Sequence, residues 1–160
     1  MIHKYKARGF VIAVIMAALL LFCGSCSSDN NIEPDSQAYA YLEVFKSMTV
    51  GVVNDEIDIG VNLTDVIYEH PSHIKKLIND YAKERNISIV WNIKKGNYNS
   101  FEFKKGYLVI FEDVELTETK LKTDVTQMLA PALASSGFTC TVEKEAGEWT
   151  ITEHEFTWMS

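Results

Sequence analysis

The sequence predicts an α+β domain in which a curved antiparallel sheet of about five strands packs on two to four helices. Apolar residues recur at helical spacing over residues 74–82, and Pro71 and Asn86 punctuate the two ends of this helix. Over residues 87–93 apolar and polar residues alternate instead, as in a half-buried strand. Ala146-Gly147 separates two further alternating segments, which predicts a closing hairpin.

Three more segments carry helical signals. Ser36 is a candidate N-cap for a helix with Tyr39, Leu42, Val44 and Phe45. A short helix is expected after Asn62. Its inward residues would be Leu63, Val66 and Ile67. Thr117 or Thr119 could cap a last helix, and Pro131 would end it near residue 130. Its apolar residues would be Leu121, Val125, Met128 and Leu129.

The patterns of the remaining segments predict strands. Tyr107 to Val114 is apolar on both faces and therefore predicts a central strand. The other expected strands are Val50–Val52 and Ile57–Val61 around an acidic turn at 54–56, Phe101–Phe103 between turns at Gly96-Asn97 and Lys105-Gly106, and a hairpin strand with Phe138, Cys140 and Val142 on one face.

The last strand has an irregular pattern. Trp149 and Ile151 share one parity, whereas Phe156 and Trp158 share the other. A regular strand cannot place both pairs on one face, because side chains alternate strictly. We expect a bulge near residues 153–155 that restores the register, or strong curling of the strand. The alternative is that the strand buries first one face and then the other.

The N-terminus has the layout of a secretory signal. Three basic residues, Lys4, Lys6 and Arg8, precede an apolar run over residues 10–23, and Gly24-Ser25-Cys26 follows. The run is shorter than the roughly 20 residues that a bilayer span needs. An uncleaved anchor helix is the alternative interpretation.

This pattern resembles that of bacterial lipoprotein precursors over residues 1–26. Gly24 and Ser25 match the small residues that this family places before the lipidated cysteine. The resemblance implies cleavage between Ser25 and Cys26 and lipidation of Cys26. Cys23 stands where the family usually has leucine, and the bulky Phe22 before it makes Cys23 a poor acceptor. The polar stretch 27–31 resembles the export signal of surface lipoproteins of Gram-negative gut bacteria. These resemblances imply anchoring at the outer membrane, on its periplasmic face or at the cell surface.

We therefore expect a signal peptide over residues 1–25, a polar tether over 26–35 and a single α+β domain over 36–160. Removing the signal leaves twelve Lys and Arg against twenty-two Asp and Glu, a net charge of −10. This charge disfavours nucleic acid and favours a basic protein partner. Cys140 would have no intramolecular partner once Cys26 is lipidated, so no disulfide is expected.

The closing segment Gly147-Glu148-Trp149-Thr150-Ile151 resembles the last hairpin of NTF2-like and cystatin-like α+β rolls. The resemblance covers about the last twenty-five residues and implies a curved sheet wrapped over helices. Members of that family include enzymes, ligand binders and partner-binding proteins such as toxin immunity proteins. Fold resemblance alone does not choose among these functions.

Candidate reactive residues are few, and the sequence lacks the common hydrolase, nucleotide-binding and metalloprotease motifs. Residues 54–65 contain spaced acids but lack the glycine and the terminal Glu of a calcium loop. His70 and His73 suit a helix start better than a metal site. In Glu153-His154-Glu155, strand alternation separates the imidazole from both carboxylates. Cys140 is expected to be a buried thiol rather than a nucleophile.

We expect no enzyme activity, cofactor or metal. The preferred hypothesis is a lipid-anchored envelope lipoprotein that binds another protein, with toxin immunity as one example. The first alternative is a small-molecule, glycan or lipid binder that uses an aromatic-lined pocket. The second alternative is an envelope enzyme, which would require a cleft with converging polar groups.

Overall fold

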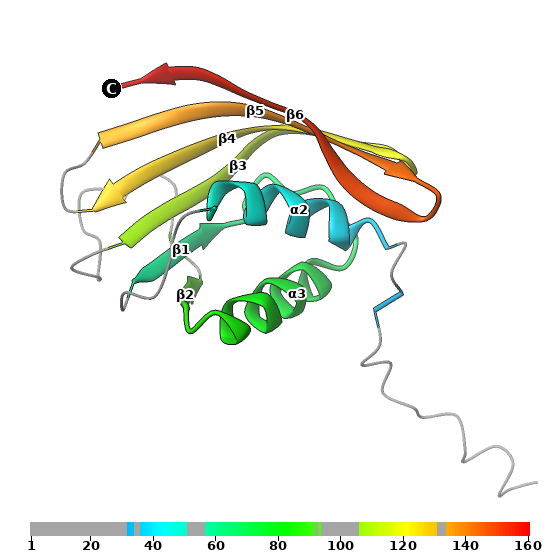
Figure 1. The fold of residues 1–160 in the computed structure, drawn as a ribbon, viewed down its shortest axis with the longest axis horizontal. Coiled ribbons are helices and arrows are strands. Elements are labelled where there is room, and N and C mark those ends of the chain that lie inside the picture. The colour runs from blue at the N-terminus through cyan, green and yellow to red at the C-terminus, as the bar shows by residue number, and fades with distance from the viewer. Residues whose placement is uncertain (1–31, 34–35, 51–56, 92, 94–105, 131–133) are drawn as a thin grey trace, which may run out of the picture. The chain divides into compact units, whose positions relative to one another are not determined.

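The computed structural model describes residues 32–33, 36–50, 57–91, 93, 106–130 and 134–160, and residues 33–160 form one compact unit. It has an α+β architecture in which a six-stranded sheet arches over two helices (Figure 1). In chain order the described elements are α2 (Ala38–Met48), β1 (Asp58–Asn62), α3 (Pro71–Glu84), β2 (Ser88–Trp91), β3 (Gly106–Leu116), β4 (Lys120–Ala130), β5 (Ala134–Glu145) and β6 (Glu148–Met159).

Some expectations fall outside the described residues. These are the signal peptide and Cys26, the acidic turn at 54–56 with Val52, the strand at Phe101–Phe103 with the turn at Gly96-Asn97, and Pro131. Val50, which was expected to open a strand, lies in a turn after α2.

The expectation of a purely antiparallel sheet is wrong. The strand order is β2-β1-β3-β4-β5-β6, and β1 pairs in parallel with both β2 and β3. Only β3 to β6 form an antiparallel meander. The parallel pairing follows from α3, which connects β1 to β2 as a helical crossover and thereby returns the chain in the same direction.

The expected helix over residues 117–130 is also wrong, because this segment is strand β4. Leu121, Thr123 and Val125 are all buried, so the segment alternates as a strand with Thr123 at an inward position. The Thr123 hydroxyl donates to the Glu112 carbonyl oxygen at 2.8 Å, which satisfies its hydrogen bond in the interior. Because Thr123 is polar, the alternation of apolar and polar residues that is typical of a strand is not apparent in this segment of the sequence.

The short helix expected after Asn62 does not form. The Asn62 side-chain oxygen instead accepts a hydrogen bond from the Thr64 backbone N–H at 2.8 Å, an arrangement typical of Asx turns. Ile67, which was expected to face inward, is exposed.

The other two helices are confirmed, with small shifts at their ends. Helix α2 begins at Ala38, and the Ser36 hydroxyl accepts from the Ala38 N–H at 3.4 Å, although Gln37 occupies the N-cap. Helix α3 starts at Pro71, and Asn86 follows it with φ of 56°, a left-handed conformation that Asn tolerates.

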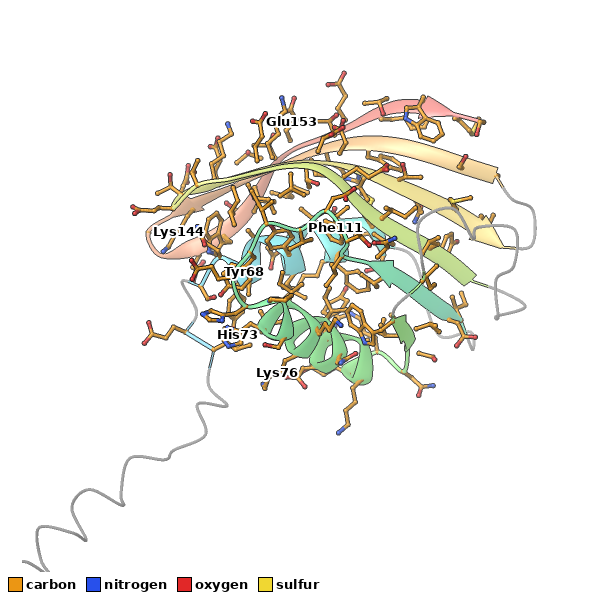
Figure 2. All side chains as sticks on the ribbon, turned by 180° about the vertical axis from the view of Figure 1, so that it is seen from behind. Tyr68, His73, Lys76, Phe111, Lys144 and Glu153 are labelled. Atoms are coloured by element: carbon orange, nitrogen blue, oxygen red, sulfur yellow. The ribbon has the colours of Figure 1, made fainter. Side chains whose placement is uncertain are left out.

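The core lies between the concave face of the sheet and the two helices. The Tyr41 ring of α2 meets Phe111 of β3 edge-on at 5.8 Å, and Phe45 meets Tyr81 of α3 at 6.1 Å. Figure 2 shows Phe111 pointing from the sheet toward the helices. At the C-terminal end of α2, the Gln127 side-chain amide donates to the Met48 carbonyl oxygen at 2.9 Å. This hydrogen bond shows that α2 lies over β4.

Strand β6 contains two register shifts against β5, so the expectation of a bulge is confirmed, whereas the expectation that it returns Trp158 to the face of Trp149 is wrong. The first leaves Thr152 without an opposite residue, and it places Trp149, Ile151, His154 and Phe156 on one face. The second leaves out Thr157 and sends Trp158 to the opposite, convex face. The Trp158 indole lies over its cross-strand partner Gly137, where a Cβ would come within 2.0 Å of the ring nitrogen.

Candidate functional site

Large apolar side chains are exposed at one end of the sheet. Phe156 is 55% exposed and Met159 is 74% exposed, both on the C-terminal half of β6. Leu129 near the end of β4 and Val50 after α2 are exposed as well. Isolated apolar residues on a surface are ordinary, so the question is whether these residues are adjacent.

The strand register places them in two cross-strand groups on one face of the sheet, because Phe138 pairs with Val125, four positions along β4 from Leu129. Tyr107 of β3 pairs with Leu129, and Phe138 of β5 pairs with Phe156. The rings of Phe138 and Phe156 are 5.7 Å apart in a T-shaped arrangement. Register and alternation therefore place these side chains on the concave face at the end of the sheet where β3 begins. We call Val50, Tyr107, Leu129, Phe138, Phe156 and Met159 the concave-end surface.

A cavity of about 290 Å³ opens within this surface. The C-terminal end of α2 forms one side and the sheet forms the other. The lining residues are Ser47, Met48, Val50, Tyr107, Gln127, Phe138 and His154. The lining combines apolar side chains with two hydroxyls, one amide and one imidazole, which suits an inserted side chain of another molecule.

Among the residues that line this cavity, His154 carries an imidazole. Its ring lies 5.1 Å from the Phe138 ring, and partial burial lowers its pKa below the usual histidine value. Glu153 and Glu155 extend to the other face, and Glu153 accepts a hydrogen bond from the Thr141 hydroxyl at 2.9 Å. Figure 2 shows Glu153 on the side away from the helices. The expected separation of His154 from both carboxylates is confirmed.

His70 and His73 come together with Tyr68 at the start of α3. Their imidazole centroids are 5.1 Å apart, and the Tyr68 hydroxyl lies 3.5 Å from His73 Nδ1. Ser36 and the Tyr68 hydroxyl are within hydrogen-bond distance at 2.9 Å. The described residues contain no group of three His, Cys, Asp or Glu side chains with metal-binding geometry. The cluster therefore joins the α2 and α3 starts through aromatic and hydrogen-bond contacts.

The acidic residues of the stretch that resembles a calcium loop do not converge within the described part of the chain. Asp58 opens β1, and Asp65 lies beyond the carboxyl end of the same strand. Asn54 and Glu56 lie outside the described residues.

Cys140 is fully buried on the concave face of β5, as expected from its alternation. Burial raises the pKa of its thiol to about 12, with a small opposing effect from a hydrogen bond with Ser47 of α2. The thiol is therefore protonated at neutral pH and lies under α2.

We predict that Cys140 does not react with iodoacetamide at pH 7.5 in the folded protein lacking residues 1–26. In urea the same thiol should become fully alkylated, because unfolding exposes it and returns its pKa to about 8.5. Intact-mass measurement gives the fraction modified. Rapid native alkylation would contradict both the burial and the raised pKa.

A comparison with protein-family models finds no match for this chain, and a comparison with curated proteins finds none either. None of the helices in the described part of the chain is long and apolar enough to span a membrane.

Sequence reasoning did not find the concave-end surface. The sequence pattern predicts a helix at Leu129, and it predicts burial of Phe156 and Trp158 on the face of Trp149 after a bulge or on the opposite face without one. The available signal was the final run of β6, where Phe156, Trp158 and Met159 lie close to the C-terminus. Such a concentration of large apolar side chains at a strand end is a surface candidate once the core is filled by other residues.

Proposed function

We propose that this chain is a lipid-anchored lipoprotein of the cell envelope whose domain binds another protein and does not catalyse a reaction. The single observation that carries the binding proposal is the concave-end surface. Exposed contiguous apolar patches on soluble domains are typical of interaction sites. The N-terminal resemblance supports anchoring through Cys26, and the polar stretch after it supports export to the outer membrane.

Charge supports a basic partner. On the convex face of the meander, three threonine hydroxyls hold carboxylates in place. These pairs are Thr126 with Glu112 at 2.8 Å, Thr139 with Asp124 at 2.7 Å, and Thr141 with Glu153 at 2.9 Å. With a net charge of −10 after signal removal, the domain would steer a positively charged protein toward it. Immunity against a basic toxin is one concrete version of this role.

The same cavity bears on the small-molecule alternative. The cavity within the concave-end surface, at about 290 Å³, lies close to the lower limit of about 300 Å³ for ligand pockets. It is open on one side and its lining is continuous with exposed Val50, which fits an inserted partner side chain better than an enclosed ligand. The resemblance of the hairpin to NTF2-like and cystatin-like rolls agrees with either role, while parallel strand β1 departs from it.

The test is affinity capture with the full-length lipoprotein from its native envelope at low salt. We expect one basic protein to be recovered, and recovery should fall as salt rises. The double variant Phe156→Ser and Met159→Ser should lose that protein. Thr150→Ala, at an exposed position on the other end of β6, is the matched control and should retain it. Equal recovery by all three proteins, or repeated recovery of none, would refute the proposal.

A further inference from the structure

A second pocket lies at the opposite end of β1, away from the concave-end surface. The parallel strands β1 and β2 both end there, and α3 begins there, because α3 connects the two strands. The cavity has a volume of about 280 Å³. Its lining residues are Val61, Asn62, Leu63, Thr64, Pro71, Lys75, Trp91 and Ile93.

The topology favours a ligand at this position. From β1 the chain passes to β2 on one side and later to β3 on the other side of β1. In open sheets, ligands bind outside the carboxyl ends of parallel strands near the point where the strand order reverses, which here lies between β1 and β3, beside the pocket. Asn62 is the last residue of β1 and therefore stands at that point.

Asn62 supplies an independent observation. It is only 3% exposed, and its side-chain nitrogen Nδ2 is buried without a hydrogen-bond partner among the residues that the structure describes. The other amide atom, Oδ1, is occupied by the Thr64 N–H. A buried donor left unpaired destabilises the folded protein, so a ligand oxygen that accepts from Nδ2 would recover this loss.

The other polar groups around the cavity are also donors or positive. Helix α3 has no side-chain cap at its N-terminus, so its first turn presents the positive end of the helix dipole. Lys75, one turn into α3, places its ammonium 5.5 Å from the centre of the Trp91 ring. None of the lining residues carries a carboxylate. The site thus attracts negative charge within an acidic protein.

The remaining lining is apolar. Val61, Leu63 and Ile93 line the cavity together with Trp91, whose Nε1 donates a hydrogen bond to Asn79 Oδ1 at 3.0 Å. We propose that this pocket binds a small organic anion, whose carboxylate faces Asn62, Lys75 and the start of α3 and whose apolar part lies against Trp91. This site is separate from the proposed protein-binding surface.

The test is titration of the ¹⁵N-labelled protein lacking residues 1–26, whose core lies within the compact unit 33–160. Isovalerate is the probe, and isovaleramide is its neutral counterpart of the same shape. We expect the Trp91 indole N–H signal to shift saturably with isovalerate, and isovaleramide to bind at least about tenfold more weakly. Inorganic phosphate tests whether the apolar part is needed and should also bind more weakly.

Three variants test which residues of the pocket bind isovalerate. Asn62→Asp keeps the oxygen that accepts from Thr64 but replaces the donor with a negative charge, and it should abolish isovalerate binding. Lys75→Gln should weaken isovalerate binding about tenfold, and this variant does not alter a buried side chain as Asn62→Asp does. Lys76→Gln is the matched control, because Lys76 lies next in sequence and pairs with Asp80 at 3.0 Å.

The Lys75→Gln result remains decisive if Asn62→Asp fails to fold. An absence of saturable shifts up to about 20 mM isovalerate would overturn the proposal. Equal binding of isovaleramide, phosphate binding as tight as isovalerate binding, or equal weakening by Lys76→Gln would overturn it as well.

Discussion

Replacing Cys26 with alanine should abolish incorporation of labelled palmitate and release the protein from the membrane fraction. Acyl chains contribute about 0.8 kcal/mol per buried methylene to membrane binding, so several chains make attachment effectively permanent. A protein without these chains should therefore leave the membrane fraction completely. The measurement is metabolic labelling followed by fractionation of the envelope. This is the largest effect that we expect from any single substitution in the chain.

Cys23→Ala is the matched control for this prediction. It removes the neighbouring thiol, yet Gly24 and Ser25 still precede Cys26. Labelling should therefore remain at the level of the unmodified protein. Persistent labelling of Cys26→Ala, or loss of labelling in Cys23→Ala only, would contradict the assignment of Cys26 as the acceptor.

Replacing Phe111 with alanine should reduce the free energy of unfolding by about 3–5 kcal/mol, as for other buried aromatic residues. Phe111 is fully buried in the central strand β3 and contacts Tyr41 of α2. Its loss would leave a cavity between the sheet and the helix. Small domains are stable by only about 5–15 kcal/mol, so this variant should be close to unfolding.

Urea titration of the protein lacking residues 1–26 measures this change. Phe156→Ala is the matched control, because it makes the same chemical change at a side chain that is 55% exposed. We expect the control to lose about 1 kcal/mol, mainly from its contact with Phe138. Equal losses for the two variants would show that Phe111 does not occupy the core as described.

The sequence predicted best those elements whose burial follows a regular period. Helix α3 presents Ile74, Leu77 and Ile78 on one buried face, and the central strand β3 is apolar on both faces. In both cases the local pattern and the tertiary environment agree. The sequence predicts a helix where strand β4 forms, because Thr123 places a polar residue at a buried, inward position. The hydrogen bond from the Thr123 hydroxyl to the Glu112 carbonyl oxygen of the neighbouring strand explains why a polar residue is tolerated there.

Pairing partners were less predictable than elements. The parallel alignment of β1 with β3 joins segments that are distant in sequence, and no local signal specifies it. Prediction of the concave-end surface likewise requires the pairing of strands that are distant in sequence. The second bulge, at Thr157, places Phe156 and Trp158 on opposite faces of the sheet. Threonine is common in regular strands, so its presence in the sequence does not indicate a bulge.

The burial of Asn62 could not be read from the sequence either. Asn62 was expected to precede a helix, whereas it ends β1 and lies in a pocket with Lys75 and Trp91. These three residues are separated along the chain, and the crossover through α3 brings them together. Sites of this kind become visible only when the strand order is known.

The central claim is that the concave-end surface binds a protein partner in the envelope, and site-specific photo-cross-linking tests it most directly. A photoreactive benzoylphenylalanine at position 156 should form one adduct of defined mass in living cells. The same group at position 150, on the other end of β6, should form none. A defined adduct from position 156 alone is the result that we predict, whereas no adduct from position 156, or the same adducts from both positions, would contradict the claim.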